Sequence, residues 1–468
     1  MVTIQETELK EGILEAIERA KALSKPILVS EVQQINHIDP LSFFSAGRAT
    51  FFGERFFWKD PADETFIIGL GICKQIQTDL AIDRFTYIEE EWRRFTKDAI
   101  VYNKYHINGI GPLMFGGFSF DPYKKKTKLW SKYDDSLFHI PKFMLSEIEG
   151  QAYLTTNVVC TQHDDRTLIE KVGAERNAIL SSIVESTCVG NHTLLKEIEV
   201  NPEQWMNTVN TIIEELKDNP LKKVVLARES RLFFDQPVQI EMVLSQLLKL
   251  QRESFIFAFE SNGDCFIGAS PERLVKKDEN TLFTTCLAGS IARGKTVEDD
   301  HLLGETLLND EKNLVEHQYV VDMIKAAMED ASEEVTLADQ PQLMKMRDIQ
   351  HLYTPVIGRA KEHTSLLLLV DRLHPTPALG GLPKNKAVEK IREVEELDRG
   401  FYGAPLGWMD YKGNGEFVVS IRSGLIQGHE ASIFAGCGVV EDSNAESEYV
   451  ETKIKFRPML TALGGINQ

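Results

Sequence analysis

Three glutamates occur at spacings that suit a divalent cation. Glu448 and Glu451 are three residues apart in a segment with helical spacing, so both project from one face, and Lys455 lies one turn beyond. Glu316 stands in a second helical segment, beside an apolar stripe. Carboxylates grouped in this way suit Mg²⁺, a hard ion that takes oxygen ligands and keeps several waters. For any single glutamate in so acidic a chain, a solvated helix surface is the commoner explanation.

A second pattern matches a nucleotide-binding loop. Residues 289–296 read Gly-Ser-Ile-Ala-Arg-Gly-Lys-Thr, and residues 366–371 resemble the apolar strand that would end in a magnesium-binding aspartate. In a P-loop ATPase, backbone amides cradle the phosphates and Lys295 reaches the outer ones. Here three acidic residues, 298–300, would lie where the phosphate charge must sit. We therefore expect the glycines of residues 289–296 to let the backbone approach a ligand other than a nucleotide closely. A P-loop ATPase remains the alternative from a different class of function.

Hairpins and separate groups of helices must position these residues. Short apolar runs divided by turns predict antiparallel strands at 223–228, 255–260, 265–268, 273–276 and 282–287. Apolar residues at helical spacing predict helices at 8–23, 165–188, 202–217, 240–250, 299–331, 385–397 and 445–463. Because strands come in hairpins with helices between the groups, we expect an α+β fold rather than a doubly wound parallel sheet.

Composition limits the possible classes of protein. The 468 residues, 43% hydrophobic and 26% charged, can bury a substantial core. With 52 Lys and Arg against 71 Asp and Glu, the net charge is −19, which argues against nucleic acid or anionic lipid as a partner. The six cysteines include no C-x-x-C pair, and the sequence shows no signal peptide and no long apolar run. We expect a soluble, cytoplasmic monomer or weak homodimer with free thiols.

Eight sets of residues in the second half follow the order found in one enzyme family. They are KVVLAR at 223–228, FIGASPE at 266–272, LAGS at 287–290 with RG at 293–294, VEH at 315–317, HPTPALGG at 374–381, FYG at 401–403, SIRS at 420–423, and GCGVV at 436–440 with EYVETKIK at 448–455. Together they resemble the chorismate-utilising enzymes, which include isochorismate, salicylate, anthranilate and aminodeoxychorismate synthases. The resemblance is strong over residues 200–462 and only architectural upstream.

This resemblance implies a fold and a division of the chain. The family fold has two large, mostly antiparallel β-sheets packed together, with helices on the outside. Residues 1–195 would form the less specific N-terminal part of the sandwich, and residues 200–464 the chorismate-binding catalytic region. Both parts are expected to belong to one compact structural unit.

The resemblance also assigns roles to individual positions. Glu316, Glu448 and Glu451 match the family's magnesium-binding glutamates, whereas Asn313 stands where one family pattern has a further acidic residue. The positions that match substrate-binding residues are Gly289, Ser290, His351, Ala378, Leu379, Tyr402, Arg422, Gly436, Gly438 and Lys455. The apparent P-loop is thus the family's substrate loop.

Three positions favour water as the nucleophile. Lys223 stands where isochorismate and salicylate synthases carry a general base and where anthranilate synthases typically have glutamine. Ala288 replaces the nucleophilic lysine of many aminodeoxychorismate synthases, and Ala378 replaces a threonine usual in anthranilate synthases. The resemblance therefore implies a magnesium-dependent isochorismate synthase with chorismate as substrate. The long N-terminal part favours the menaquinone type; a siderophore-pathway isochorismate synthase and a salicylate synthase are the alternatives.

The implied chemistry needs an unusual pair of protonation states. Lys223, as a neutral amine, would take a proton from water, and Glu272, as a neutral acid, would give one to the departing hydroxyl. Desolvation drives both groups in the required direction, because it disfavours their charged forms. Without the resemblance, a surface lysine at a strand end and a solvated glutamate after Pro271 would be the commoner explanations.

Overall fold

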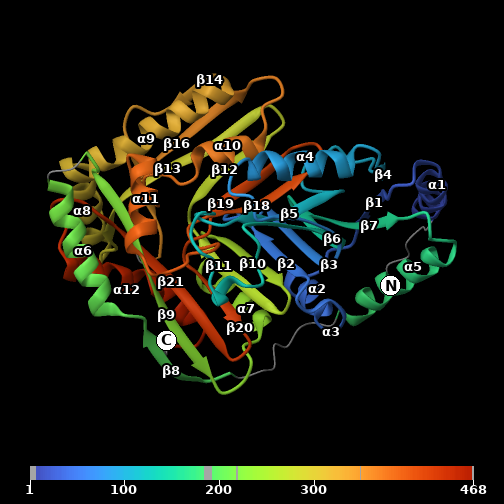
Figure 1. Ribbon diagram of the computed structural model, residues 1–468, viewed down its shortest axis with the longest axis horizontal. Coiled ribbons are helices and arrows are strands. Elements are labelled where there is room, and N and C mark those ends of the chain that lie inside the picture. Colours follow the sequence, from blue (N-terminus) through green and yellow to red (C-terminus); the bar gives the residue numbers. More distant parts are fainter. Residues whose placement is uncertain (1–6, 184–191, 218–219, 348, 466–468) are drawn as a thin grey trace.

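The computed structural model describes residues 7–183, 192–217, 220–347 and 349–465 (Figure 1). Hydrogen bonds join all 21 strands of these residues into one sheet that divides at β6 (Ser136–Ile148). One edge of β6 pairs along its whole length with β3 (Thr65–Thr78). Its other edge pairs first with β5 (Leu113–Phe118) and then with β7 (Gln151–Cys160). Two sheets therefore diverge from this strand.

The first sheet extends from β6 in two directions. Beyond β7 it continues through β1 (Ile27–Ile35) and β4 (Ile100–Tyr102). Beyond β3 its strands are, in spatial order, β2 (Arg55–Lys59), β10 (Phe255–Ser261), β11 (Asp264–Ser270), β20 (Ser423–Gln427), β21 (Glu430–Val439) and β9 (Lys223–Phe234). The free edge of β9 pairs with β8 (Leu194–Glu199) and with the short β17 (Gly381–Leu382).

The second sheet runs outward from β5. Its strands are, in spatial order, β18 (Pro405–Asp410), β19 (Gly415–Val419), β12 (Arg273–Asp278), β13 (Thr281–Ala292) and β16 (Ile349–Ala360), with β14 (Ser332–Leu337) and β15 (Gln342–Lys345) on the far edge of β16. Within the described part of the chain, only the pairing of β1 with β4 is parallel. The predicted α+β fold with two large antiparallel sheets is confirmed, and shared strands join the sheets into one network.

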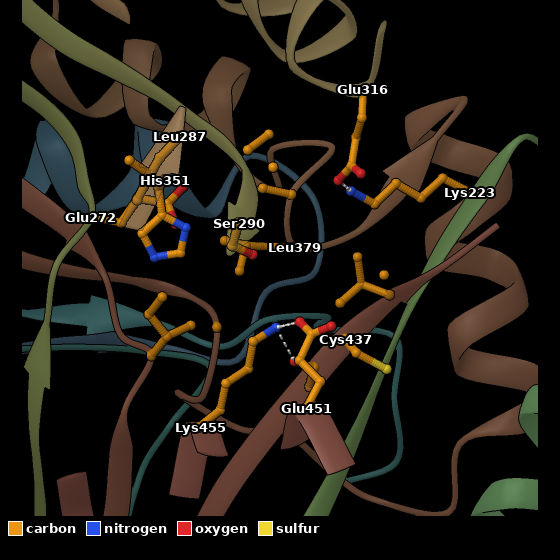
Figure 2. A pocket seen from close by; sticks show the side chains of 18 of the residues that line it. Lys223, Glu272, Leu287, Ser290, Glu316, His351, Leu379, Cys437, Glu451 and Lys455 are labelled. Carbon is orange, nitrogen blue, oxygen red and sulfur yellow. Dashed lines mark hydrogen bonds and ion pairs between the residues drawn. The ribbon is translucent and has the colours of Figure 1, made fainter. Parts of the chain in front are cut away.

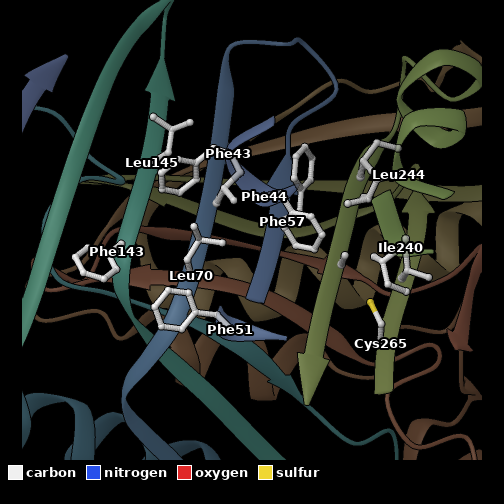
Figure 3. Close-up of a cluster of buried hydrophobic side chains, with 14 of the residues drawn as sticks. Phe43, Phe44, Phe51, Phe57, Leu70, Phe143, Leu145, Ile240, Leu244 and Cys265 are labelled. Carbon is white, nitrogen blue, oxygen red and sulfur yellow. The ribbon is translucent and has the colours of Figure 1, made fainter. Parts of the chain in front are cut away.

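The core lies in three layers. Aromatic residues of both sheets, such as Trp58, Phe115, Phe259 and Trp408, pack between them. On the outer face of the first sheet lies a second cluster, which includes Phe43, Phe57 and Leu244 (Figure 3). The helices that cover it are α1 (Thr7–Leu23), α2 (Pro40–Ala46), α3 (Arg48–Phe51), α5 (Thr167–Ser182), α7 (Ile240–Leu250) and α12 (Ala445–Ala462). On the second sheet, the covering helices are α4 (Arg84–Thr96), α9 (Glu311–Ala331) and α10 (Leu366–Leu373). Helices α6 (Pro202–Lys217) and α11 (Lys384–Val394) pack against β9.

One helix prediction differs from the structure, and so does the strand that the nucleotide-binding alternative required at residues 366–371. The single helix expected at 299–331 is wrong: α8 (Val297–Leu308) ends before Asp310, whose side chain caps α9 by accepting from the amide of Asn313 at 2.8 Å. The apolar run 366–370 lies in helix α10 rather than in a strand, and Ser365 caps that helix. The end of the helix predicted at 165–188 lies outside the described residues, since α5 ends at Ser182.

Candidate active site

Every site residue predicted from the sequence lines one cavity of about 300 Å³ (Figure 2). Strands β9 and β21 of the first sheet form one wall, and β13 and β16 of the second sheet form another. Helices α9 and α12 contribute the glutamates. The remaining residues come from turns and loops next to β12, β17, β18 and β20. Residues separated by more than 200 positions in the chain are thus brought to one site.

Lys223 lies at the start of β9, and its side chain crosses a glycine of the neighbouring strand. Register places Gly438 of β21 opposite Val225. A Cβ atom at Gly438 would lie 2.5 Å from Lys223 Cε and 3.1 Å from Nζ, closer than van der Waals contact allows. A side chain at position 438 would therefore force the end of the Lys223 side chain to move from this place.

Lys223 is paired with a glutamate from the opposite side of the cavity. Its Nζ donates to Glu316 Oε1 of helix α9 at 2.5 Å, and Lys223 is only 8% exposed. Burial acts to raise the pKa of Glu316, but the charge of Lys223 outweighs it, so this pKa is lowered. The candidate base and a candidate metal ligand therefore share one ion pair.

Glu272 follows the end of β11 and is buried in the same cavity. Its backbone is fixed on both sides: its amide donates to Ser270 Oγ at 3.2 Å, and its carbonyl accepts from the amide of Val419 at 3.1 Å. Burial raises the pKa of Glu272 to about 7, against the lowering effect of Arg422, Lys223 and, more weakly, Lys455. A carboxyl group of this kind retains its proton close to neutral pH and can act as an acid.

Strands β13 and β16 form the wall next to Glu272. A register shift at Gly289, which has φ +78°, brings Ser290 opposite His351. Burial, aided by the charges of Arg422 and Lys455, lowers the pKa of His351 to about 3. The ring is therefore neutral near pH 7, and its buried Nε2 has no hydrogen-bond partner within the described residues. It offers a substrate hydroxyl or carboxyl group an unused polar atom.

Two further cations, Lys455 and Arg422, line the cavity. Lys455 Nζ donates to the carbonyl of Gly436 at 2.9 Å and pairs with Glu451 Oε1 at 2.5 Å (Figure 2). Arg422 has φ +52°, a left-handed conformation that is uncommon for a residue with a side chain. Its carbonyl accepts from the amide of Ala269 at 3.1 Å, which helps to hold this turn. Such backbone strain persists where the fold must direct a side chain to one place.

The three candidate metal ligands belong to the cavity but do not form a closed cluster. Burial acts to raise the pKa of Glu451, but Lys455 outweighs it and the pKa is lowered. Burial raises the pKa of Glu448, and the neighbouring Glu451 adds to this effect. In the described stretches of chain, no three acidic, histidine or cysteine side chains converge at ion-binding distance. Carboxylate oxygens are suitable ligands for Mg²⁺. Two of these carboxylates, Glu316 and Glu451, are ion-paired with lysines.

The apparent P-loop has another role in this structure. Gly289 and Ser290 belong to strand β13, and the amide of Gly294 donates to Asp300 Oδ1 at 3.0 Å. The side chain of Thr296 caps helix α8 by accepting from the amide of Asp299 at 3.1 Å. Carboxylates and a cap therefore lie where phosphate would bind, which contradicts the nucleotide alternative.

Comparison with known proteins identifies the family. The family model described as chorismate binding enzyme matches residues 15–464. The chain belongs to this family. It is 44% identical over 469 residues to the isochorismate synthase MenF of Bacillus subtilis, covering 99% of each chain. It is 34% identical to the salicylate biosynthesis isochorismate synthase of Pseudomonas aeruginosa, covering 97% of this chain and 94% of the relative.

Solved structures of chorismate binding enzymes share the fold. The menaquinone-specific isochorismate synthase MenF of Escherichia coli matches with a TM-score of 0.78 at 22% identity, covering 98% of this chain and 100% of that chain. Anthranilate synthase component I of Streptococcus pneumoniae matches with a TM-score of 0.70 at 19% identity, covering 85% and 92%. The two-sheet fold is therefore shared with both of these solved structures.

Sequence reasoning missed two charged residues that line the cavity of this chorismate binding enzyme, Lys312 and Arg399. Arg399 lies two residues before the motif at 401–403 and pairs with Glu395, four residues upstream in sequence. In the sequence, a Glu and an Arg four residues apart are typical of a solvated helix surface. Both side chains are 4% exposed, and this burial is decided by contacts with distant segments. The one feature of the sequence that could have indicated Arg399 as a cavity residue is its closeness to the motif at 401–403.

Proposed function

We propose that this chorismate binding enzyme is an isochorismate synthase. The observation that supports this most strongly is the placement of Lys223 and Glu272 in one cavity, with the pKa of Glu272 raised to about 7. A base and an acid on different walls can act on opposite ends of one small ring. The full-length relative in Bacillus subtilis bears the same name.

Chorismate carries two carboxylates, so the cavity must supply positive charge despite the acidic chain. We assign one of them to Arg422, whose planar guanidinium suits a two-point contact, with Lys455 close by. Glu316, Glu448 and Glu451 would hold Mg²⁺, which supplies positive charge for the second carboxylate when bound. Ser290 and the neutral His351 provide polar contacts to the hydroxyl and ether oxygens.

The reaction moves a hydroxyl group around the ring. Lys223 must first release one proton of the ammonium group that is paired with Glu316. As the free amine, it then accepts a proton from water while the water oxygen forms a bond to ring carbon 2. The two ring double bonds shift, and the bond from carbon 4 to its hydroxyl oxygen breaks. Glu272 donates its proton to that hydroxyl, which leaves as water. One water is consumed and one is released, so the product is an isomer of the substrate, isochorismate.

The direct test is product analysis. Purified protein is incubated with chorismate, with and without added Mg²⁺, and the products are separated by chromatography. Isochorismate formed only with the metal supports the proposal. Salicylate accompanied by pyruvate would instead identify a salicylate synthase, which shares the lysine base but goes on to eliminate pyruvate. Recovery of unchanged chorismate in the presence of Mg²⁺ would contradict both.

We further propose that the isochorismate serves menaquinone formation in the cytoplasm. The Escherichia coli MenF is described as menaquinone-specific, and the full-length Bacillus subtilis relative bears the same name, MenF. The Pseudomonas aeruginosa relative is named for salicylate biosynthesis. No helix in the part of the chain that the structure describes is long and apolar enough to cross a membrane. The cysteines within it, at 73, 160, 265, 286 and 437, are free thiols. Loss of menaquinone in a deletion strain, restored by this gene, is the expected cellular result.

A further inference from the structure

A buried ion pair lies next to the candidate active site. Arg399 Nε donates to both carboxylate oxygens of Glu395, at 3.0 and 2.8 Å, and Nη2 donates to Oε1 at 2.5 Å. Arg399 Cζ also lies 4.2 Å from the centroid of the Phe120 ring. Neither residue of the pair is among those that the resemblance or the mechanism uses. A buried charged pair of this kind requires that its remaining polar atoms find partners as well.

The remaining atoms of the pair bind the backbone of two segments that carry site residues. Arg399 Nη2 donates to the carbonyl of Val225 at 2.6 Å, and Nη1 donates to the carbonyl of Leu379 at 3.2 Å. Glu395 Oε1 accepts from the amide of Ala227 at 2.9 Å. Val225 and Ala227 follow Lys223 on β9 at intervals of two, so all three residues line the same cavity.

The segment around Leu379 is also attached directly to β9. The amide of Val225 donates to the carbonyl of Gly380 at 3.0 Å, and β17 pairs with Lys223 and Val224. On the other side, the carbonyl of Arg399 accepts from the amide of Tyr402 at 2.8 Å. The ion pair therefore contacts three parts of the cavity wall: the strand of the base, the loop of Ala378 and Leu379, and the turn of Tyr402.

We propose that Glu395 and Arg399 are a positioning pair that sets the Lys223 strand against the substrate-binding loop. Each Arg399 nitrogen already donates to a protein acceptor, and the charge is offset by Glu395. We therefore do not assign a substrate carboxylate to Arg399; that role is given to Arg422. The pair affects catalysis indirectly, because it fixes the position of Lys223. This inference rests on the proposed function, in which Lys223 is the base.

Loss of the pair should reduce turnover more than substrate affinity. A shift of about 1 Å at a reacting group can cost about 100-fold in rate, whereas Arg422 and Lys455 remain to bind the substrate. In Arg399→Ala we expect kcat per folded molecule to fall by about 100-fold, with KM changed by less than about threefold. Guanidinium ion added at a non-denaturing concentration should raise the kcat of this variant at least about tenfold, because it can bind the acceptors that Arg399 has lost.

A second buried arginine, bonded to two glutamates, provides the matched control. Arg55 donates to Glu260 at 2.6 Å and to Glu241 at 2.8 Å, is 1% exposed, and does not line the cavity. Arg55→Ala should lower thermal stability without lowering kcat per folded molecule, and guanidinium ion should not raise its kcat. If Arg399→Ala fails to fold, Glu395→Leu with Arg399→Met removes both charges together, which buried pairs often tolerate. That variant should fold and still lose about 100-fold in kcat.

The outcomes separate this inference from the proposed function. The product formed by the unmodified protein tests the proposed function. The kcat of the variants, measured for the product that the unmodified protein forms, tests the role of the pair. A kcat per folded molecule in the Arg399 variants equal to that of the unmodified protein would overturn the inference. Equal restoration of Arg55→Ala and Arg399→Ala by guanidinium ion would also overturn it, because the pair would then act on folding alone.

Discussion

Lys223 Nζ donates to Glu316 Oε1 at 2.5 Å, which joins strand β9 to helix α9 across the candidate active site. In the same cavity, Lys455 pairs at the same distance with Glu451, one turn before it on helix α12. Two of the three candidate metal ligands therefore have a lysine partner. A cation that binds these carboxylates competes with both lysines, so substitutions at the glutamates are expected to affect metal binding and the basic residues together.

Removal of a candidate metal ligand should raise the Mg²⁺ requirement. We expect Glu451→Gln to increase the Mg²⁺ concentration for half-maximal turnover by at least about tenfold, because a carboxylate ligand is replaced by a neutral amide. Glu446→Gln on the same helix is the control, since Glu446 is exposed and does not line the cavity. Turnover is measured over a Mg²⁺ titration after treatment with a chelator. Equal Mg²⁺ requirements in the two variants would remove Glu451 from the metal site.

Loss of the Lys223 amine should abolish most of the turnover. Lys223→Met retains much of the side-chain volume but cannot accept a proton, and we expect kcat to fall by about 100-fold or more. The matched control is Lys59→Met: Lys59 is also buried and ion-paired, with Asp63 at 2.7 Å, but it does not line the cavity. The control should lose stability and keep its kcat per folded molecule. Near-normal turnover in Lys223→Met would exclude Lys223 as the base.

Glu272 should give the pH profile a descending limb near neutrality. The acid must be protonated, so kcat/KM should fall as pH rises through about 7. Glu272→Gln should lose about 100-fold in turnover, and its residual activity should lack this limb. Asp410→Asn is the control, because burial also raises the pKa of Asp410, to about 6, at a site outside the cavity. Asp410→Asn should still show the fall in kcat/KM near neutral pH. If Glu272→Gln also shows this fall, a group other than Glu272 causes it.

The same carboxyl group should make stability depend on pH. Glu272 keeps its proton up to about 7 in the folded protein but only up to its ordinary value of 4.5 when unfolded. Stability relative to Glu272→Gln should therefore be greatest below pH 4.5 and fall as pH rises from 4.5 through 7. Thermal unfolding of the two proteins across this range measures the difference. A difference in Tm that stays constant with pH would show that the carboxyl group is ionised when folded.

Gly438→Ala should displace the candidate base without changing the cavity elsewhere. The three atoms nearest to a Cβ at this position all belong to Lys223. We expect turnover to fall about 10- to 100-fold, because a small displacement of a reacting group is costly. The control is the double variant Lys223→Ala with Gly438→Ala, in which the contact between position 438 and the lysine side chain is absent. Its turnover should be no lower than that of Lys223→Ala alone. Additive losses would show that position 438 acts through something other than Lys223.

Local patterns in the sequence were sufficient for much of the fold. Alternating apolar runs with turn residues between them predicted the hairpins of β10 to β13, because side-chain period and turn chemistry depend on neighbouring residues. The break between α8 and α9 was missed although Asp310 carries an N-cap signal, since apolar residues at helical spacing continue across it. Motif order indicated the family and the cavity residues before any contact was known.

The sequence by itself determined the element types, the family and the set of residues that could do chemistry. Tertiary structure alone decided which of their charges are buried and paired. Lys223 and Glu316 are 93 positions apart, and Glu395 and Arg399 became a buried pair only through contacts with β9 and Leu379. The physical reason is that desolvation and electrostatic attraction depend on everything packed around a group, whereas spacing along a chain reports only its local face.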